Sequence, residues 1–334
     1  MTVLGASEGG DAFFAELQDD ERTVFAPTNE AFTSAGFPEN FSTAAAEDLD
    51  LDTLRQVLLY HIASDDITDD TIAVAPANTI VDTLLEGGSN NSAIQFGNDQ
   101  SVPLVLNRES DSATGFSIFN NGQPIPVTSQ AVEVGNIQLY TIDQIIPLPP
   151  SLAALAEAAG LTQLAGALTD TNLLEALNGS TGGLTIFAPN DAAFQAIASD
   201  IEGLDTATIA TVLQNHVVNG TVAFSDDIDL DDTDGDDVVT PLAGEPFTFA
   251  QENGNITISS GNATATIIGT DYVFNGGVVH VSIFQTPSNS HPQITAPASH
   301  IFRLLDPIRS HYRWSWKLRL QLTITVDRRR PRQH

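Results

Sequence analysis

The chain has 334 residues, with 43 acidic side chains against 12 Lys and Arg, a formal net charge of −31 and no cysteine. The acidic balance argues against nucleic acids and anionic membrane surfaces as partners, because both carry the same sign of charge. The lack of cysteine excludes a fold held together by disulfides.

The charge is divided unevenly along the chain. Residues 1–281 hold 3 basic and 41 acidic side chains, a net of −38, whereas residues 282–334 hold 9 basic and 2 acidic, a net of +7. A body this acidic repels itself in dilute buffer, and molar salt shortens the Debye length to about 3 Å. We therefore predict a halophilic source and loss of the fold on dialysis into low salt; full ellipticity in dilute buffer would contradict this.

The first predicted element is a segment that occurs twice. Residues 23–32 read T-V-F-A-P-T-N-E-A-F and residues 185–194 read T-I-F-A-P-N-D-A-A-F, with six of ten positions identical. A repeat separated by more than a hundred residues indicates two copies of one domain of ordinary size.

This segment predicts a strand followed by a helix. Residues 23–26 alternate as a half-buried strand does, and Pro27, which lacks an N–H, ends the ladder. Thr28 in the first copy and Asn190 in the second are good helix N-caps. The aromatic side chains of the two copies are predicted to be core residues: Phe25, Phe32, Phe187 and Phe194.

Each copy next predicts a helix that ends at a histidine. The runs L-R-Q-V-L-L-Y-H-I and I-A-T-V-L-Q-N-H-V contain His61 and His216, respectively. We expect both side chains to hydrogen-bond backbone groups at the helix end.

The later part of each copy reads as short strands separated by turns. The predicted strands cover residues 79–85, 92–96, 247–250, 255–259 and 263–268. Helices early and strands late indicate an α+β fold. The closing strands are G-N-I-Q-L-Y-T-I-D (135–143) and G-G-V-V-H-V (276–281), and we expect His280 on the second to be buried and paired.

A proline cluster at residues 147–150 separates the two copies. It cannot lie inside a helix or a central strand, and it is too short and stiff to be a flexible tether. We expect it to hold the two domains close together, with Ser151 capping the helix that follows.

These motifs resemble the fasciclin domain family. The family signatures are T-x-F-A-P-[TNS]-[DN]-x-A-F, a tyrosine–histidine pair, and a closing N-G-x-[IV]-H-V-I-D strand. The chain shows the first twice, Tyr60-His61 in copy one, Asn215-His216 in copy two, and N-G-G-V-V-H-V at 275–281. The signature positions are Thr23, Phe25, Pro27 and Phe32, then Thr185, Phe187, Pro189 and Phe194, with His280 on the closing strand. The resemblance covers roughly residues 10–281.

The resemblance implies two α+β domains, each a compact β-sandwich-like core of short strands flanked by helices. We place them at residues 1–148 and 149–284. Copy one has 22 residues before its signature and copy two has 34 after the proline cluster, so we expect the first domain to be incomplete at its N-terminus. Residues 285–334 form a basic Pro/Arg-rich tail, interpreted as disordered or as a frameshift artefact, the alternative being a tail that docks on an acidic surface.

The resemblance also implies a non-enzymatic adhesion or protein-interaction role outside the cell or at its surface. Partners would be cell-surface or matrix proteins or glycans, with no nucleic acid, no direct membrane insertion and no cofactor. The family's tyrosine–histidine neighbourhood makes Tyr60, His61 and His216 the partner-binding candidates. Copy one is the better of the two, because Asn215 replaces the tyrosine in copy two.

Two other functions stay open at this point. A small-molecule or lipid-binding module would need an apolar pocket lined by phenylalanines and open to solvent. A hydrolase would need His61 beside an acid and a Ser or Thr nucleophile, although the sequence contains no H-E-x-x-H, no G-x-S-x-G and no glycine-rich phosphate loop.

The Asp-rich run at residues 226–237 superficially resembles a calcium loop. Aligned on Gly235, its first ligand position is Leu230 and its twelfth is Pro241, so the EF-hand pattern fails and no metal site is predicted. A solvated acidic loop is the preferred interpretation. Weak cation binding would involve Asp229, Asp231, Asp232 and Asp234.

Overall fold

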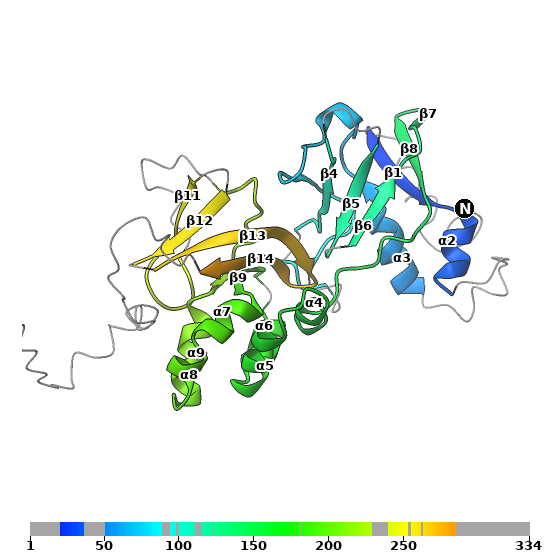
Figure 1. Cartoon of the computed structure of the whole chain (residues 1–334). Coiled ribbons are helices and arrows are strands. Elements are labelled where there is room, and N and C mark those ends of the chain that lie inside the picture. The colour runs from blue at the N-terminus through cyan, green and yellow to red at the C-terminus, as the bar shows by residue number, and fades with distance from the viewer. Residues whose placement is uncertain are drawn as a thin grey trace, which may run out of the picture.

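The computed structural model describes residues 21–36, 51–88, 94–97, 100–110, 115–121, 123–180, 182–228, 240–252, 255–261 and 263–284. Within these ranges the chain forms two units, the first unit from β1 to β8 and the second unit from α4 to β14 (Figure 1). The predicted tail (285–334) lies outside the described residues, and so do the candidate cation ligands Asp229, Asp231, Asp232 and Asp234.

The first unit contains two four-stranded sheets, ordered β2-β1-β8-β7 and β3-β4-β5-β6. Its elements are β1 (Arg22–Pro27), α2 (Asn29–Ser34), α3 (Leu51–Tyr60), β2 (Ile62–Ala63), the 3-10 turn η3 (Asp69–Thr71), β3 (Thr79–Val81), β4 (Leu104–Asn107), β5 (Phe116–Asn120), β6 (Gln123–Val127), β7 (Val132–Val134) and β8 (Ile137–Ile142). Phe25 and Tyr140 of one sheet meet Phe116 of the other, with ring centroids 5.3 to 6.1 Å apart. The two sheets therefore share one sandwich-like core.

The second unit places its strands in one six-stranded sheet, ordered β10-β9-β14-β13-β12-β11. Figure 1 shows the helices grouped on one side of this sheet. The elements are α4 (Leu152–Ala158), α5 (Thr162–Asp170), α6 (Leu173–Asn178), β9 (Leu184–Pro189), α7 (Asp191–Ala196), α8 (Ala198–Ile201), α9 (Thr206–Gln214), β10 (Val217–Asn219), β11 (Thr248–Glu252), β12 (Asn255–Ser260), β13 (Ala263–Phe274) and β14 (Gly277–Phe284). Leucines of α4, α5 and α6 are buried together with side chains of β9 and β14. Both units therefore combine helices with sheets, as the sequence predicts.

The repeated segment forms the same structure in both units. β1 runs parallel to β8, and β9 runs parallel to β14, so that Pro27 pairs with Ile142 and Pro189 pairs with Ser282. The predicted N-caps are confirmed: Thr28 Oγ1 accepts from the N–H of Ala31 at 3.2 Å, and Asn190 Oδ1 accepts from that of Ala193 at 2.9 Å. Each cap satisfies a donor that the helix itself leaves unpaired.

Only two of the four predicted core phenylalanines of this segment are fully buried. Phe25 and Phe187 are 0% and 2% exposed, whereas Phe32 and Phe194 are only partly buried. Phe194 still packs against the core of the second unit, so the prediction is corrected for Phe32. The six-residue helices α2 and α7 instead turn one alanine each, Ala31 and Ala193, fully inward. A helix this short buries a narrow stripe, so the neighbouring phenylalanine lies at its edge.

Two predicted strands are also corrected. Residues 94–96, the described part of the strand expected at 92–96, are not in a strand, and the strand expected at 79–85 ends at Val81. Beyond Val81 the chain makes isolated bridges, Thr83 with Ala63 and Glu86 with Ser101. The apolar residues here are buried without a continuous ladder, which periodicity alone does not reveal.

The two units are in contact, as the short proline spacer predicts. Phe96 of the first unit stacks on Phe224 of the second at 6.2 Å, and Phe119 meets Tyr272 at 5.6 Å. Asn78 Nδ2 donates to Asp271 Oδ2 at 2.7 Å across the same boundary. Apolar stacking and a hydrogen bond to a buried carboxyl group thus join the units.

Candidate functional site

His61 and His216 occupy equivalent positions, one residue after the end of α3 and two residues after the end of α9. Their Nδ1 atoms lie 2.6 Å from the carbonyl oxygen of Val57 and 2.8 Å from that of Val212. A carbonyl oxygen can only accept, so Nδ1 carries the proton in both rings. Burial lowers the pKa of His61 to about 4 and also lowers the pKa of His216, so both rings are neutral at pH 7 and Nε2 is a hydrogen-bond acceptor. The expectation that both bond the backbone at a helix end is confirmed.

In the first unit this acceptor is already used. The N–H of Ile146 donates to His61 Nε2 at 2.9 Å, and the Ile146 side chain is buried. Tyr60 is buried beside it and donates through its hydroxyl group to the carbonyl of Pro103 at 3.3 Å. A partner could touch Tyr60 or His61 only if this part of the unit opened.

The same contacts bear on catalysis. Both ring nitrogens of His61 bond backbone groups, the carbonyl of Val57 and the N–H of Ile146. The imidazole therefore has no free nitrogen with which to activate a Ser or Thr hydroxyl. Among the described residues, no group of three or more His, Cys, Asp or Glu could hold a metal ion.

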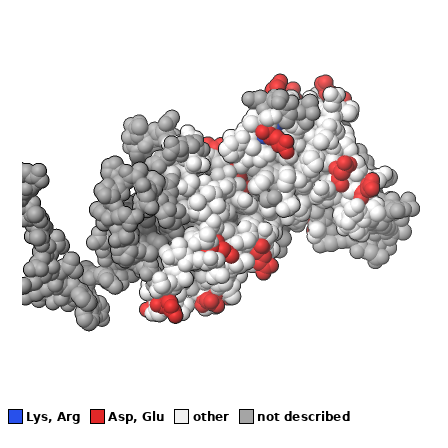
Figure 2. Space-filling view, viewed as in Figure 1, with Lys and Arg blue, Asp and Glu red and all other residues white. Residues whose placement is uncertain are grey.

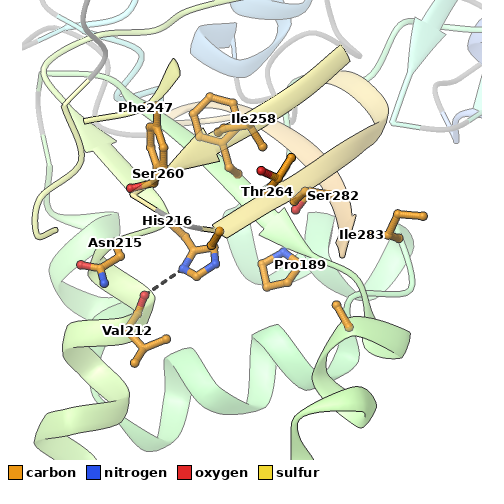
Figure 3. A pocket seen from close by; sticks show the side chains of 14 residues that line it. Pro189, Val212, Asn215, His216, Phe247, Ile258, Ser260, Thr264, Ser282 and Ile283 are labelled. Carbon is orange, nitrogen blue, oxygen red and sulfur yellow. Dashed lines mark hydrogen bonds between the residues drawn. The ribbon is translucent and has the colours of Figure 1, made fainter. Parts of the chain in front are cut away.

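In the second unit a pocket of about 70 Å³ opens beside His216 (Figure 3). Its apolar wall includes Phe187, Pro189, Val212, Phe247, Ile258 and Ile283. Its polar groups are those of Asn215, His216, Ser260, Thr264 and Ser282. No side chain that lines it carries a charge while His216 is neutral. Figure 3 shows the imidazole between Val212 and Pro189, with its second nitrogen on the side of Pro189.

Asn215 lies where the first unit has Tyr60, since each directly precedes the equivalent histidine of its copy. The amide is much smaller than a phenol ring, and this side chain forms part of the pocket wall. Asn215 is 9% exposed, and its buried Oδ1 has no hydrogen-bond partner. The acceptor that the pocket offers to a ligand with a donor is His216 Nε2, because Asn215 Oδ1 lies against Gly244, a residue outside the pocket wall.

Three further signature residues, His280, Thr23 and Thr185, make buried contacts within the fold. His280 is fully buried, stacks on Phe187 at 5.4 Å and has Nε2 2.9 Å from the carbonyl oxygen of Ala223. Thr23 Oγ1 donates to the carbonyl of Asp65 and accepts from the N–H of Ile67. Thr185 Oγ1 does the same with Thr221 and Ala223. A buried hydroxyl that both donates and accepts ties each central strand to the loop after the next strand, which explains why threonine recurs there.

The acidic composition is visible on the surface. Figure 2 shows Asp and Glu side chains scattered over the face in view, with little sign of Lys or Arg. The sequence of residues 149–284 contains no Lys or Arg at all. In the part of the chain that the structure describes, no helix is long and apolar enough to cross a membrane.

Sequence comparison agrees with this repeated architecture. The fasciclin domain matches residues 10–149 and again residues 159–282, which together make up most of the chain. The chain belongs to the fasciclin domain family and carries the domain twice in tandem.

Related proteins include a fasciclin-like arabinogalactan protein of Arthroderma benhamiae, 29% identical over 189 residues (56% of this chain, 41% of that protein). The fasciclin-like arabinogalactan protein CTB11 of Cercospora beticola is 25% identical over 263 residues (78% of this chain, 65% of that protein). The chain thus spans less than two thirds of the length of both relatives. A solved FAS1 domain pair from the insect cell adhesion molecule fasciclin I aligns with a TM-score of 0.40 and 18% identity, over 82% of this chain and 91% of that one.

Proposed function

We propose that this protein is an extracellular or cell-surface adhesion or protein-interaction module without catalytic activity. The observation that carries the proposal is the tandem fasciclin domain, because domains of this family are typically adhesion or extracellular interaction modules. Two relatives are named fasciclin-like arabinogalactan proteins, which favours a protein or glycan partner at the cell surface or in the matrix. The acidic surface disfavours nucleic acid.

The interacting surface would be presented by a rigid pair of domains, at residues 1–148 and 149–284. Tyr60 and His61 are buried, so we expect a partner to contact His216, whose ring faces a pocket, in preference to them. Shape and hydrogen bonding would contribute to binding, and ion pairs would form mainly with basic groups of a partner, because residues 21–284 contain three basic side chains and many acidic ones.

The test is retention of the purified full chain on cell-envelope fragments at high salt. We expect saturable binding by the folded chain and none by the heat-unfolded chain. An unrelated folded protein of similar net charge is the control. Retention no greater than that of the control would overturn the proposal.

A second candidate is a small-molecule or lipid-binding module. It is favoured by the pocket of the second unit, whose wall includes Phe187 and Phe247. A mostly apolar concave site with a few placed polar groups is typical of ligand pockets. Saturable binding of a neutral amphipathic small molecule, lost when the pocket is filled, would support this candidate over the first.

A further inference from the structure

We propose that the pocket of the second unit binds an extended peptide segment, an aliphatic residue followed by proline, whose backbone N–H donates to His216 Nε2. The proposal rests on the proposed function, since it names the partner chemistry of a protein-interaction module. It follows from comparing one position in the two units.

The first unit contains the template for this complex. Ile142 and Ser282 are equivalent, because they pair with Pro27 and Pro189 in the two parallel ladders. Four residues beyond Ile142, Ile146 buries its side chain and donates its N–H to His61, and Pro147 follows. The first unit thus holds a segment of its own chain, Ile-Pro, against its histidine.

The second copy does not contain an equivalent of the Ile-Pro segment at this position. Four residues beyond Ser282 the sequence has Thr286, a polar residue, where the first copy has Ile146. The tyrosine that helps close the first unit is replaced by Asn215. Both changes reduce the apolar volume available near His216, so an aliphatic side chain from another molecule is the natural complement of the pocket wall.

The chemistry of the pocket selects a peptide over a fatty acid. His216 Nε2 is an acceptor at the pocket wall, and such an acceptor is stabilised by an N–H donor. A carboxylate would find no cation, because residues 149–284 contain no Lys or Arg. The volume of about 70 Å³ is several times what one water needs, enough for an aliphatic side chain.

The experiment uses the full chain and a fluorescein-labelled peptide of the template sequence, Q-I-I-P-L-P-P, read by fluorescence polarisation at high salt. We expect saturable binding. N-methylation of the second isoleucine removes the donor aimed at His216 and is expected to weaken binding about tenfold. Because this change lies in the peptide, it leaves the fold of the protein untouched.

The matched protein variant is Thr264→Trp, which puts a large ring at an exposed position of the pocket wall. We expect it to abolish peptide binding. Thr169→Trp makes the same substitution at an exposed threonine of α5, away from the pocket, and should bind as the unaltered chain does. Circular dichroism of both variants checks that they are folded.

Three results would overturn the inference: no saturation at about 1 mM peptide, equal binding of the N-methylated peptide, or undiminished binding by folded Thr264→Trp. Saturable binding of dodecanoate with no peptide binding would also overturn it, in favour of the lipid candidate. Envelope retention is measured in parallel. Retention without peptide binding would contradict only this inference. Peptide binding without retention would support the pocket as a peptide site and contradict the proposed adhesion role.

Discussion

The equivalent histidines of the two units have different surroundings. In the first unit, His61 is closed in by Tyr60 and by the N–H of Ile146. In the second unit, His216 keeps the same bond to the preceding helical turn but borders a pocket beside Asn215. One motif position can therefore serve packing in one copy and line a potential binding site in the other. The residue before the histidine is one of the differences that separate these outcomes.

The units also differ in how their sheets are connected. In the first unit β6 and β7 belong to different sheets, and residues 128–131 separate them. In the second unit one long strand, β13, pairs with both β12 and β14. Its pairing with β14 shifts register near Gly269, and Asp271 has a left-handed backbone at φ 64°. Bulges let one strand bend and pair with two neighbours, so a duplicated domain can keep its core while changing its sheet count.

The largest effect expected from this comparison is that of Tyr60→Asn, which gives the first unit the residue of the second. It removes a buried ring and its hydrogen bond to Pro103, so we expect a loss of about 3–5 kcal/mol in the free energy of unfolding. Urea unfolding at high salt measures it. Asn215→Ala is the control and should change stability by about 1 kcal/mol or less, because its Oδ1 has no partner to lose. A loss below about 1 kcal/mol for Tyr60→Asn would show that the closed state of the first unit does not depend on this ring.

The same reasoning limits what alanine variants of Tyr60 and His61 can reveal about adhesion. Both side chains are buried, so their truncation would reduce binding through unfolding whether or not they contact a partner. Variants at the His216 pocket separate folding from binding better.

Local sequence signals predicted the parts of this structure that depend on neighbouring residues. The N-caps Thr28 and Asn190, the histidines after α3 and α9, and the buried Phe25 and Phe187 all follow from spacing within about ten residues. The duplication itself predicted the two units.

Contacts between distant residues were beyond such signals. Asn78 and Asp271 are 193 positions apart, and neither lies in a motif. The pocket depends on side chains of β9, α9, β12 and β14 that meet only in the folded sheet. The available clues were Asn215 in place of the tyrosine and Thr286 in place of Ile146, both of which change the side-chain volume at positions that the first unit fills.

A second, smaller effect is a pH dependence carried by His61. Its pKa is about 4 in the folded state and about 6.5 when unfolded, so the unfolded chain takes up the proton first. Stability is therefore lost as pH falls from about 6.5 to about 4, by an amount on the order of 3 kcal/mol.

Comparison with His61→Gln isolates this contribution, because the many carboxylates titrate alike in both proteins. Urea unfolding of the two chains between pH 7 and pH 4 measures the difference between their free energies of unfolding. This difference should become smaller as the pH falls. A difference that stays constant over this range would mean that the ring is not held neutral by burial.

From the contact between the units we expect Asn78→Ala to lower the free energy of unfolding by about 2 kcal/mol. This change removes the bonds that Asn78 Nδ2 donates to Asp271 Oδ2 and Thr270 Oγ1, and hydrogen bonds to a buried carboxyl group are among the stronger ones. The matched control is Asn107→Ala, which removes only a bond within the first unit, the one from Asn107 Nδ2 to Asn78 Oδ1. Differential scanning calorimetry should show one transition separating into two for Asn78→Ala alone. An unchanged single transition would place the coupling in the aromatic contacts instead.

The smallest effects on the free energy of unfolding are expected at the two helix caps. They occupy equivalent positions in the two copies of the repeated segment, so their variants can be compared directly. Thr28→Ala and Asn190→Ala each leave a backbone N–H of the first helical turn unpaired and should cost about 1 kcal/mol, with asparagine the better cap and its loss the larger. Thr169→Ala is the control, because Thr169 is exposed within α5 and bonds only the carbonyl of Ala165, so its change should be near zero or slightly stabilising. Denaturant midpoints of the three variants measure these differences. Equal midpoints for the caps and the control would mean that packing of the parallel strands, and not the cap, fixes where α2 and α7 begin.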